Sequence, residues 1–409
     1  MNETTGVVLE TKRDESRVNL LFLALGHGVT DAYSNFFPGL VFFLSDRLSL
    51  TAAHVGLLTT VVSITGSMSQ LIYGHLADRV RRAYFIVLGP AAAAIFMSLL
   101  GSANSLAVLA ILLALGGSGV ASFHPQAAIG AGSGPVRRRG ADLAFFISVG
   151  TAGYALGPLF ATQVAVRFGL ERTWLAAIPG VLAALLLYAT VYRRLEAGYR
   201  SGPEDDGSKG DIAASPLLPA RKPRLPATIV ALWGIVSLRA AVSTSLIQFM
   251  PLFLKEREFG PTYASAAVSL FVFAGAVGGM AGGPLADRWG RRRVLIGSLL
   301  LSTPALCGLT LVPSAAFLAL FFTAGFVLNI SAPANVAMAQ EIAPERQGTA
   351  SAWVQGFAFG TGGLLAGLAG YAADRTSIAL VYQVLAFVPA LTVPIAAMLP
   401  ETLHGSRKG

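Results

Sequence analysis

The chain has 409 residues, of which 54% are hydrophobic and only 12% are charged, and its mean hydropathy is +0.64. Soluble domains carry about 25% charged residues, so a soluble fold of this length could not cover so much apolar surface. The net charge of +9 comes mainly from basic residues in short polar segments, and no basic stripe interleaved with aromatic residues predicts nucleic-acid binding. The composition therefore excludes a soluble domain and indicates a membrane protein.

Twelve apolar segments are long enough to cross a bilayer, which takes about 20 helical residues. The first six occupy residues 18–45, 52–78, 83–101, 104–131, 139–167 and 172–194. The second six occupy residues 226–254, 262–286, 292–311, 313–340, 348–373 and 377–400. The first segment lacks the small-residue cleavage site of a signal peptide, so we expect it to stay in the protein. We predict an all-α membrane protein with twelve transmembrane helices.

A polar segment at residues 195–225 separates the two sets of six. It is rich in Gly, Ser, Pro, Asp and Lys, a composition typical of a flexible linker. Most lysines and arginines fall in this linker, in the tails and after every second apolar segment, which favours a cytoplasmic location for both termini. The predicted divisions are a tail, an N-terminal half, the linker, a C-terminal half and a second tail, at residues 1–17, 18–194, 195–225, 226–403 and 404–409.

An internal repeat relates the two halves. The turn after the second apolar segment contains Gly74, Asp78 and Arg79, and the turn after the eighth contains Gly283, Asp287, Arg288, Gly290 and Arg291 in a matching pattern. Parallel repeats of this kind are a recurrent plan of membrane transporters. Both turns resemble the cytoplasmic signature of the major facilitator superfamily, although Arg81 stands where the signature has glycine. The resemblance implies a cytoplasmic gate, in which the acid pairs with a basic residue or a helix N-terminus of the neighbouring segment.

Enzyme and cofactor motifs are missing from the sequence. It contains no Walker-type loop, no HExxH and no GxSxG, and its single cysteine, Cys307, lies in an apolar run. We therefore expect no enzyme activity, no disulfide, no metal site and no cofactor. Energy should come from an ion gradient.

Asp31 is the only carboxylate well inside a predicted span. His27 lies one helical turn earlier and Asn35 one turn later, so the three side chains share a face. An ionisable group at membrane depth is costly and usually faces the bundle interior or a wet cavity. Asp31 is therefore either a proton carrier or a static hydrogen-bonding group between helices.

Two more ionisable side chains lie inside predicted spans. Arg239 suits an anionic substrate because its planar fork matches phosphonate, phosphate or carboxylate, or else it forms a salt bridge with Asp31 across the halves. His124 is a second proton site or a substrate contact, or it donates to a backbone carbonyl that Pro125 leaves free. Further candidate polar contacts are Gln248, Asn329, Asn335 and Gln355.

A narrower resemblance covers most of the chain. The segments 26–31, 122–126, 339–348 and 356–363 are similar to the fosmidomycin-resistance family of drug exporters, with Gln126 where that family has glutamate. The resemblance implies proton antiport of a small drug-like or organic-anion substrate by alternating access, in a bacterial inner membrane. From the residues inside the spans, we predict proton coupling at Asp31, His27 and His124, and substrate contacts at Arg239, Asn35, Gln126, Gln248, Asn329 and Gln355.

The fifth apolar segment carries glycines at helical spacing, with Gly153, Gly157 and Pro158 in a pattern similar to the antiporter motif of drug–proton exchangers. Such glycines let helix backbones approach closely, and the proline introduces a bend. They form either a pliable hinge or seal between the halves, or ordinary small-residue packing.

Two other functions fit the same residues. One is proton-coupled uptake of a small organic anion, and the other is a non-transporting membrane sensor with a fixed Asp31–Arg239 bridge. In each case we expect a monomer in a lipid bilayer, with no nucleic-acid partner. Transport would involve a small molecule and protons.

Overall fold

The computed structural model describes residues 3–79, 82–133, 138–194, 227–312 and 314–402. These residues form helices and turns, and no strand occurs among them. The predicted linker at 195–225 and the C-terminal tail at 404–409 lie outside the described residues.

The N-terminal half begins with α1, which starts at Glu3 and so includes most of the predicted tail. Its helices are α1 (Glu3–Ser34), α2 (Phe36–Leu48), α3 (Ala52–Val62), α4 (Gln70–Arg79), α5 (Tyr84–Ser98), α6 (Leu106–Ala131), α7 (Arg139–Phe168) and α8 (Ala177–Leu187). Short π-helical segments at Ser63–Met68 and Tyr188–Tyr192 join α3 to α4 and extend α8.

The C-terminal half repeats this layout. Its helices are α10 (Ala227–Lys255), α11 (Pro261–Trp289), α12 (Arg291–Gly308), α13 (Ser314–Asn329), α14 (Ala332–Ile342), α15 (Gln347–Ala352), α16 (Ala358–Arg375) and α17 (Ile378–Met398). A π-helical segment, Trp353–Phe357, leads into α16.

Ten of the described helical segments are long and apolar enough to cross a membrane. Neither the first predicted span nor the ninth is among them. α12 begins with Arg291, Arg292 and Arg293, and α1 carries ionisable residues and ends at Ser34. The full count of twelve therefore stays a prediction.

Two breaks interrupt predicted spans, one in the first span and one in the tenth. α1 ends at Ser34, and Pro38, four residues on, has no N–H to donate to the Ser34 carbonyl. Pro333 stands in the same relation to Asn329, where α13 ends. Asn35 and residues 330–331 thus lie at the helix breaks.

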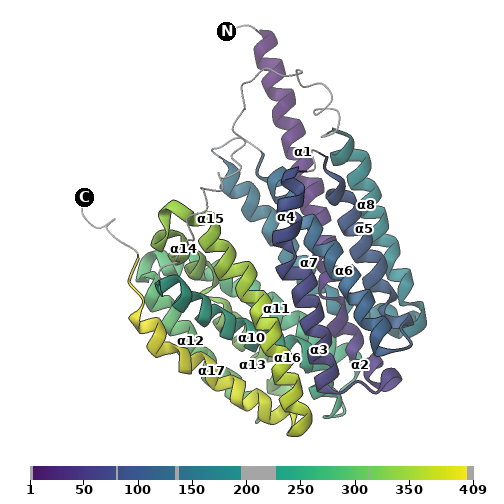
Figure 1. Cartoon of the computed structure of the whole chain (residues 1–409), viewed down its shortest axis with the longest axis vertical. Helices are drawn as coiled ribbons and strands as arrows, with labels where there is room; N and C mark the ends of the chain where they lie inside the picture. Colours follow the sequence, from purple (N-terminus) through teal and green to yellow (C-terminus); the bar gives the residue numbers. More distant parts are fainter. Residues whose placement is uncertain (1–2, 80–81, 134–137, 195–226, 313, 403–409) are drawn as a thin grey trace.

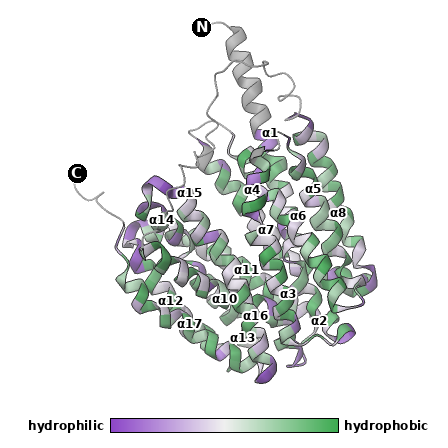
Figure 2. Cartoon of the chain, in the orientation of Figure 1, coloured by the Kyte–Doolittle hydropathy of each residue, from purple (hydrophilic) through white to green (hydrophobic). Residues whose placement is uncertain are grey.

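The two halves lie side by side and contact each other through α3 with α16, α7 with α11, and α2 with α10 (Figure 1). The helices of the two halves diverge toward the end of the molecule where α1 begins, as Figure 1 shows. Apolar residues run along the helices while polar ones gather at their ends (Figure 2). Large side chains such as Leu71, Met280 and Leu311 are 63–75% exposed, an apolar surface that lipid would cover.

Candidate functional site

Asp31 lies between two histidines. His27, one turn earlier on α1, places Nε2 3.2 Å from one carboxylate oxygen, and His124 of α6 places Nε2 3.1 Å from the other. The structure thus brings together the three residues predicted to couple protons. We call them the proton triad.

Backbone carbonyls fix the other nitrogen of each histidine. His27 Nδ1 is 2.9 Å from the Phe146 carbonyl oxygen on α7, and His124 Nδ1 is 2.8 Å from the Val120 carbonyl oxygen. A carbonyl oxygen only accepts, so both Nδ1 atoms donate and both Nε2 atoms face the carboxylate. Pro125 leaves the carbonyl of Ala121 without its helical N–H donor. His124 bonds the carbonyl of Val120, one residue earlier, and so does not bond the carbonyl that Pro125 leaves free.

This arrangement sets how many protons the triad can hold. With both Nδ1 protons committed, each Nε2–carboxylate contact needs its own proton to be a hydrogen bond. With both protons present, two imidazoliums flank one carboxylate and the net charge is +1. Loss of one proton gives a neutral triad, and loss of both leaves lone pairs facing the carboxylate. Loss of both protons would therefore remove two hydrogen bonds: the one that joins Asp31 of α1 to His124 of α6, and the one between Asp31 and His27 within α1.

The triad is enclosed unevenly. The His27 side chain is 7% exposed, whereas those of Asp31 and His124 retain 15% and 24%. The ring of His27 stacks on Phe146, with centroids 4.1 Å apart, and meets His124 edge-on at 5.0 Å. His27 is thus the most enclosed of the three side chains, and Asp31 and His124 are more accessible.

The same three residues could in principle hold a metal ion, since one ligand atom of each lies within 4.8 Å of the others. The nitrogen–oxygen separations of 3.1 and 3.2 Å are those of hydrogen bonds. The proton-coupling role and the expectation of no metal site both stay predictions.

Arg239 of α10 is buried in the other half. Its Nη1 donates to Asn329 Oδ1 of α13 at 2.7 Å, its Nε has no hydrogen-bond partner, and the residue is 3% exposed. The expected Asp31–Arg239 pair is wrong, because Asp31 binds the two histidines and Arg239 binds Asn329. Within the described residues no carboxylate pairs with Arg239. An uncompensated buried guanidinium is costly, so this position is suited to an anion.

Other predicted polar residues divide into two groups. Asn35 donates to the Tyr154 carbonyl at 3.0 Å while its Oδ1 is unpartnered, and Gln248 Oε1 is also buried without a partner. Both amide atoms of buried Asn335 lack partners as well. Buried polar atoms are nearly always hydrogen-bonded, so these groups are available to water or substrate.

Gln126 and Gln355 differ from these unpartnered amides, and their role as substrate contacts stays a prediction. Gln126 accepts from the Phe85 N–H and donates to the Arg82 carbonyl, both at 3.0 Å, and so holds the start of α5 to α6. Gln355 lies exposed in the π-helical segment before α16.

The gate signature of the second half forms a network within that half. Arg291 bonds Glu341 at 2.8 Å and Asp287 at 3.3 Å, and its backbone N–H donates to Glu401 at 2.8 Å. The pairing of the signature acid with a basic residue is thereby found, while Arg288 is exposed. Gly74 and Gly283 face open space. The side chains of Asp78 and Arg79 lie outside the described residues.

The glycines of α7 pack within the N-terminal half. A side chain at Gly153 or Gly157 would strike the carbonyl of Gly28 or Ala32 on α1, and the Pro158 carbonyl closely approaches Gly39. The motif therefore seats α1 and α2 against α7. Its role as a hinge stays a prediction.

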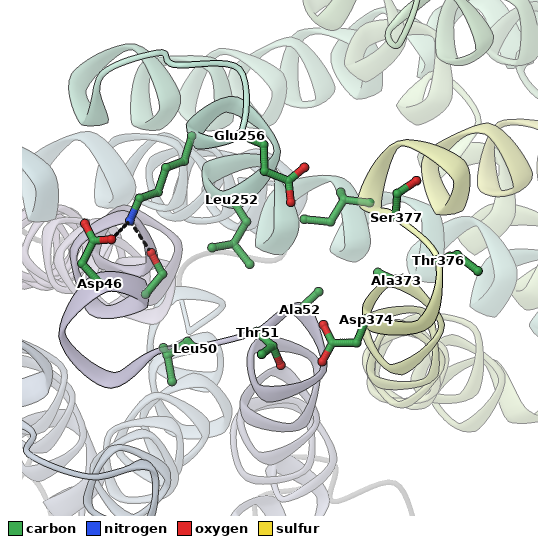
Figure 3. Close-up of a pocket in the computed structure, with 13 residues that line it drawn as sticks. Asp46, Leu50, Thr51, Ala52, Leu252, Glu256, Ala373, Asp374, Thr376 and Ser377 are labelled. Carbon is green, nitrogen blue, oxygen red and sulfur yellow. Dashed lines mark hydrogen bonds and ion pairs between the residues drawn. The ribbon is translucent and has the colours of Figure 1, made fainter.

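A cluster that the sequence did not predict joins the halves at the end remote from the N-terminus. Lys255 of α10 contacts Asp46 at 2.5 Å, Ser45 Oγ at 2.7 Å and the Phe42 carbonyl at 2.9 Å, all on α2 (dashed lines in Figure 3 mark the first two). A neighbouring pocket of about 550 Å³ lies between the ends of α2, α3, α10, α16 and α17. In the sequence, the only sign of this cluster is a lysine, Lys255, at the end of an apolar segment.

The sequence profile of the Major Facilitator Superfamily matches residues 23–261 and 232–408. The chain belongs to this superfamily. It is therefore a multi-pass membrane transporter rather than an enzyme.

Named relatives agree with this assignment. The chain is 29% identical to the fosmidomycin resistance protein of Escherichia coli (strain K12) over 93% of its own length and 92% of that protein. It is 25% identical, with the same coverage, to the uncharacterized MFS-type transporter YfnC of Bacillus subtilis (strain 168).

Solved structures show the same fold. A bacterial homologue of the human lysosomal transporter Spinster, in an inward-facing and unoccupied conformation, matches with a TM-score of 0.71 and 18% identity, over 95% of this chain and 96% of that one. The nucleoside transporter NupG matches with a TM-score of 0.70 and 13% identity, over 93% of this chain and all (100%) of that one.

Proposed function

We propose that this transporter exports a small organic anion, such as the phosphonate fosmidomycin, in exchange for protons. One observation carries the proposal: a proton triad lies in the N-terminal half and an uncompensated buried guanidinium lies in the C-terminal half. Rocking of one half against the other changes both sites together, which is how alternating access couples two ligands.

The remaining parts of the proposal come from charge and similarity. The distribution of basic residues supports twelve spans with both termini in the cytoplasm of a bacterial inner membrane. Export is proposed from the similarity to a protein named for fosmidomycin resistance. We further propose a monomer that needs no cofactor and is driven by the proton gradient.

Arg239 supports an anionic substrate. Its guanidinium has one neutral amide partner and a free Nε donor, so a phosphonate or carboxylate would supply the missing charge and a further acceptor. Two unpartnered amides, Gln248 on the same helix and Asn335 on α14, are additional candidate contacts.

Proton-coupled uptake of an anion is the second candidate. The doubly protonated triad carries a net charge of +1, so protonation would attract an anion rather than repel it. The sensor alternative required a fixed Asp31–Arg239 bridge, which the structure does not contain.

Fosmidomycin accumulation tests the direction and the role of Asp31. We would express the wild type, Asp31→Asn and the control Glu345→Gln, an exposed acid, in bacteria stripped of their own exporters, at equal membrane levels. Export predicts accumulation below that of empty cells for wild type and control, abolished by an uncoupler and by Asp31→Asn. Gradient-dependent accumulation above that of empty cells would establish uptake, and unchanged accumulation would refute fosmidomycin transport.

A further inference from the structure

α7 packs along α1, and three of its glycines face that helix at helical spacing. At two of these positions, Gly153 and Gly157, the neighbour is a backbone carbonyl of α1. At Gly150 the neighbour is instead the ring of His27, a member of the proton triad. Gly150 therefore leaves space for a side chain, the His27 ring, whereas Gly153 and Gly157 leave space for the backbone of α1.

A methyl group at position 150 would occupy the space of the His27 ring. It would lie 2.5 Å from Nδ1 and 2.6 Å from Nε2, well inside van der Waals contact. Either the ring or the helix would have to move.

The ring has no free direction in which to move. Its Nδ1 donates to the Phe146 carbonyl at 2.9 Å, its Nε2 lies 3.2 Å from the Asp31 carboxylate, and its face stacks on Phe146. Movement by a few tenths of an ångström would lengthen hydrogen bonds on both sides of the imidazole. A methyl at position 150 thus acts directly on the triad.

We propose that Gly150 is a positioning residue that seats the His27 ring in the proton triad. Phe146 and Gly150 lie one turn apart on α7: the first supplies the carbonyl that fixes the ring's tautomer, and the second leaves the space that the ring fills. This role rests on the proposed function, because it gives Gly150 an effect on proton coupling through His27.

A double-mutant cycle tests the contact. Gly150→Ala, His27→Ala and the double variant would be purified, and their melting temperatures and fosmidomycin-driven proton flux measured in proteoliposomes from pH 5 to pH 9. Gly153→Ala, alone and with His27→Ala, is the matched control, because it strains the same helix contact without touching the ring.

We expect the effects of Gly150→Ala and His27→Ala on stability and on the pH profile to be strongly non-additive. Gly150→Ala should shift the pH profile in the same way as His27→Ala, and the double variant should match His27→Ala alone. If Gly150→Ala does not fold, His27→Ala should restore folding by vacating the space. Gly153→Ala should lower stability equally in both backgrounds.

Two results would overturn the role of Gly150: a wild-type pH profile in folded Gly150→Ala, or an equal loss of stability from Gly150→Ala with and without His27. A wild-type pH profile in His27→Ala would instead refute the proton role of His27. The melting temperatures of the same four proteins would then still decide whether Gly150 seats the ring.

Discussion

Arg239 is a buried cation whose only hydrogen-bond partner among the described residues is neutral, and this distinguishes a candidate anion site from a permanent salt bridge. A permanent salt bridge would give the guanidinium a carboxylate partner, yet Asn329 offers only a neutral oxygen at 2.7 Å. Under the proposed function, an anionic substrate supplies the missing charge. Supplying that charge from the protein should block the ligand.

Asn329→Asp makes this test. An aspartate would place a carboxylate where the amide now accepts from Nη1, so we expect at least a roughly ten-fold loss of substrate affinity, about 1.4 kcal/mol. The melting temperature should be unchanged or higher because the guanidinium gains a counter-charge. Binding of fosmidomycin to the purified protein would measure the affinity. Asn329→Ala, which adds no charge, should bind more tightly than Asn329→Asp, and equal binding by all three proteins would contradict an anion site.

Residue-level predictions from the sequence succeeded where the partners share a helix. The i,i+4 spacing of His27 and Asp31 predicted their contact, which is found at 3.2 Å. His124 was a candidate because it is ionisable inside an apolar run, but its contact with Asp31 depends on how α6 packs against α1. The partner of Arg239 was missed for the same reason: Asn329 comes from α13, and no local pattern indicates which helices meet.

At the level of helices, proline and glycine were the residues in the sequence that best indicated helix breaks and close helix contacts. Pro38 and Pro333 lie just after the breaks before α2 and α14, and each lacks the N–H that would continue the helix across the break. Prolines inside the unbroken α6, α7 and α10 show that a proline alone does not predict a break. The π-helical segments had no such signal. The first and ninth predicted spans are the two that are not among the ten long apolar helices, since their ionisable residues lower the apolar character by which a span is recognised.

Gly290 between α11 and α12 offers a prediction about the gate signature. Its φ of +97° and ψ of 145° are accessible only to glycine, and an added methyl would lie 2.5 Å from the Glu401 carboxylate. We expect Gly290→Ala to destabilise the protein by about 1–3 kcal/mol. It should also loosen the Arg291–Glu401 contact.

The matched control is Gly297→Ala on α12, where a methyl meets nothing within 4 Å. Because alanine favours a helix over glycine, this change should stabilise by up to about 1 kcal/mol. Thermal unfolding of the purified variants would show shifts of opposite sign. A shift of the same sign and size would mean that Gly290 has no special backbone role.

For the whole molecule, the question is what holds the halves together at one end. The Lys255 ammonium bonds two side chains and one carbonyl of α2, and Gln163 of α7 lies 3.3 Å from Thr262 of α11 nearby. No comparable ion pair joins the halves at the opposite end among the described residues; the Arg291 network stays within one half. The Lys255 cluster should therefore stabilise the conformation seen here over one opened at this end.

Lys255→Met tests that balance. Cys307→Ser would remove the native thiol, and Leu252→Cys would place a reporter on the wall of the adjacent pocket. Exposed ion pairs contribute about 0.2–1 kcal/mol and hydrogen bonds to a charge somewhat more, so we expect labelling by an impermeant maleimide to accelerate roughly two- to ten-fold. The gain arises because loss of the cluster raises the population opened at this end.

Charge exchange gives the sharper version of the experiment. Asp46→Lys combined with Lys255→Asp should return labelling toward the wild-type rate, although either change alone accelerates it, because the pair is restored with its signs reversed. Arg47→Met is the control, since Arg47 pairs with Glu171 at 3.8 Å within the N-terminal half. If Arg47→Met accelerated labelling as much as Lys255→Met, charge at this surface rather than the bond between the halves would be responsible. If Lys255→Met left the rate unchanged, contacts between α3 and α16 and between α7 and α11 alone would close this end.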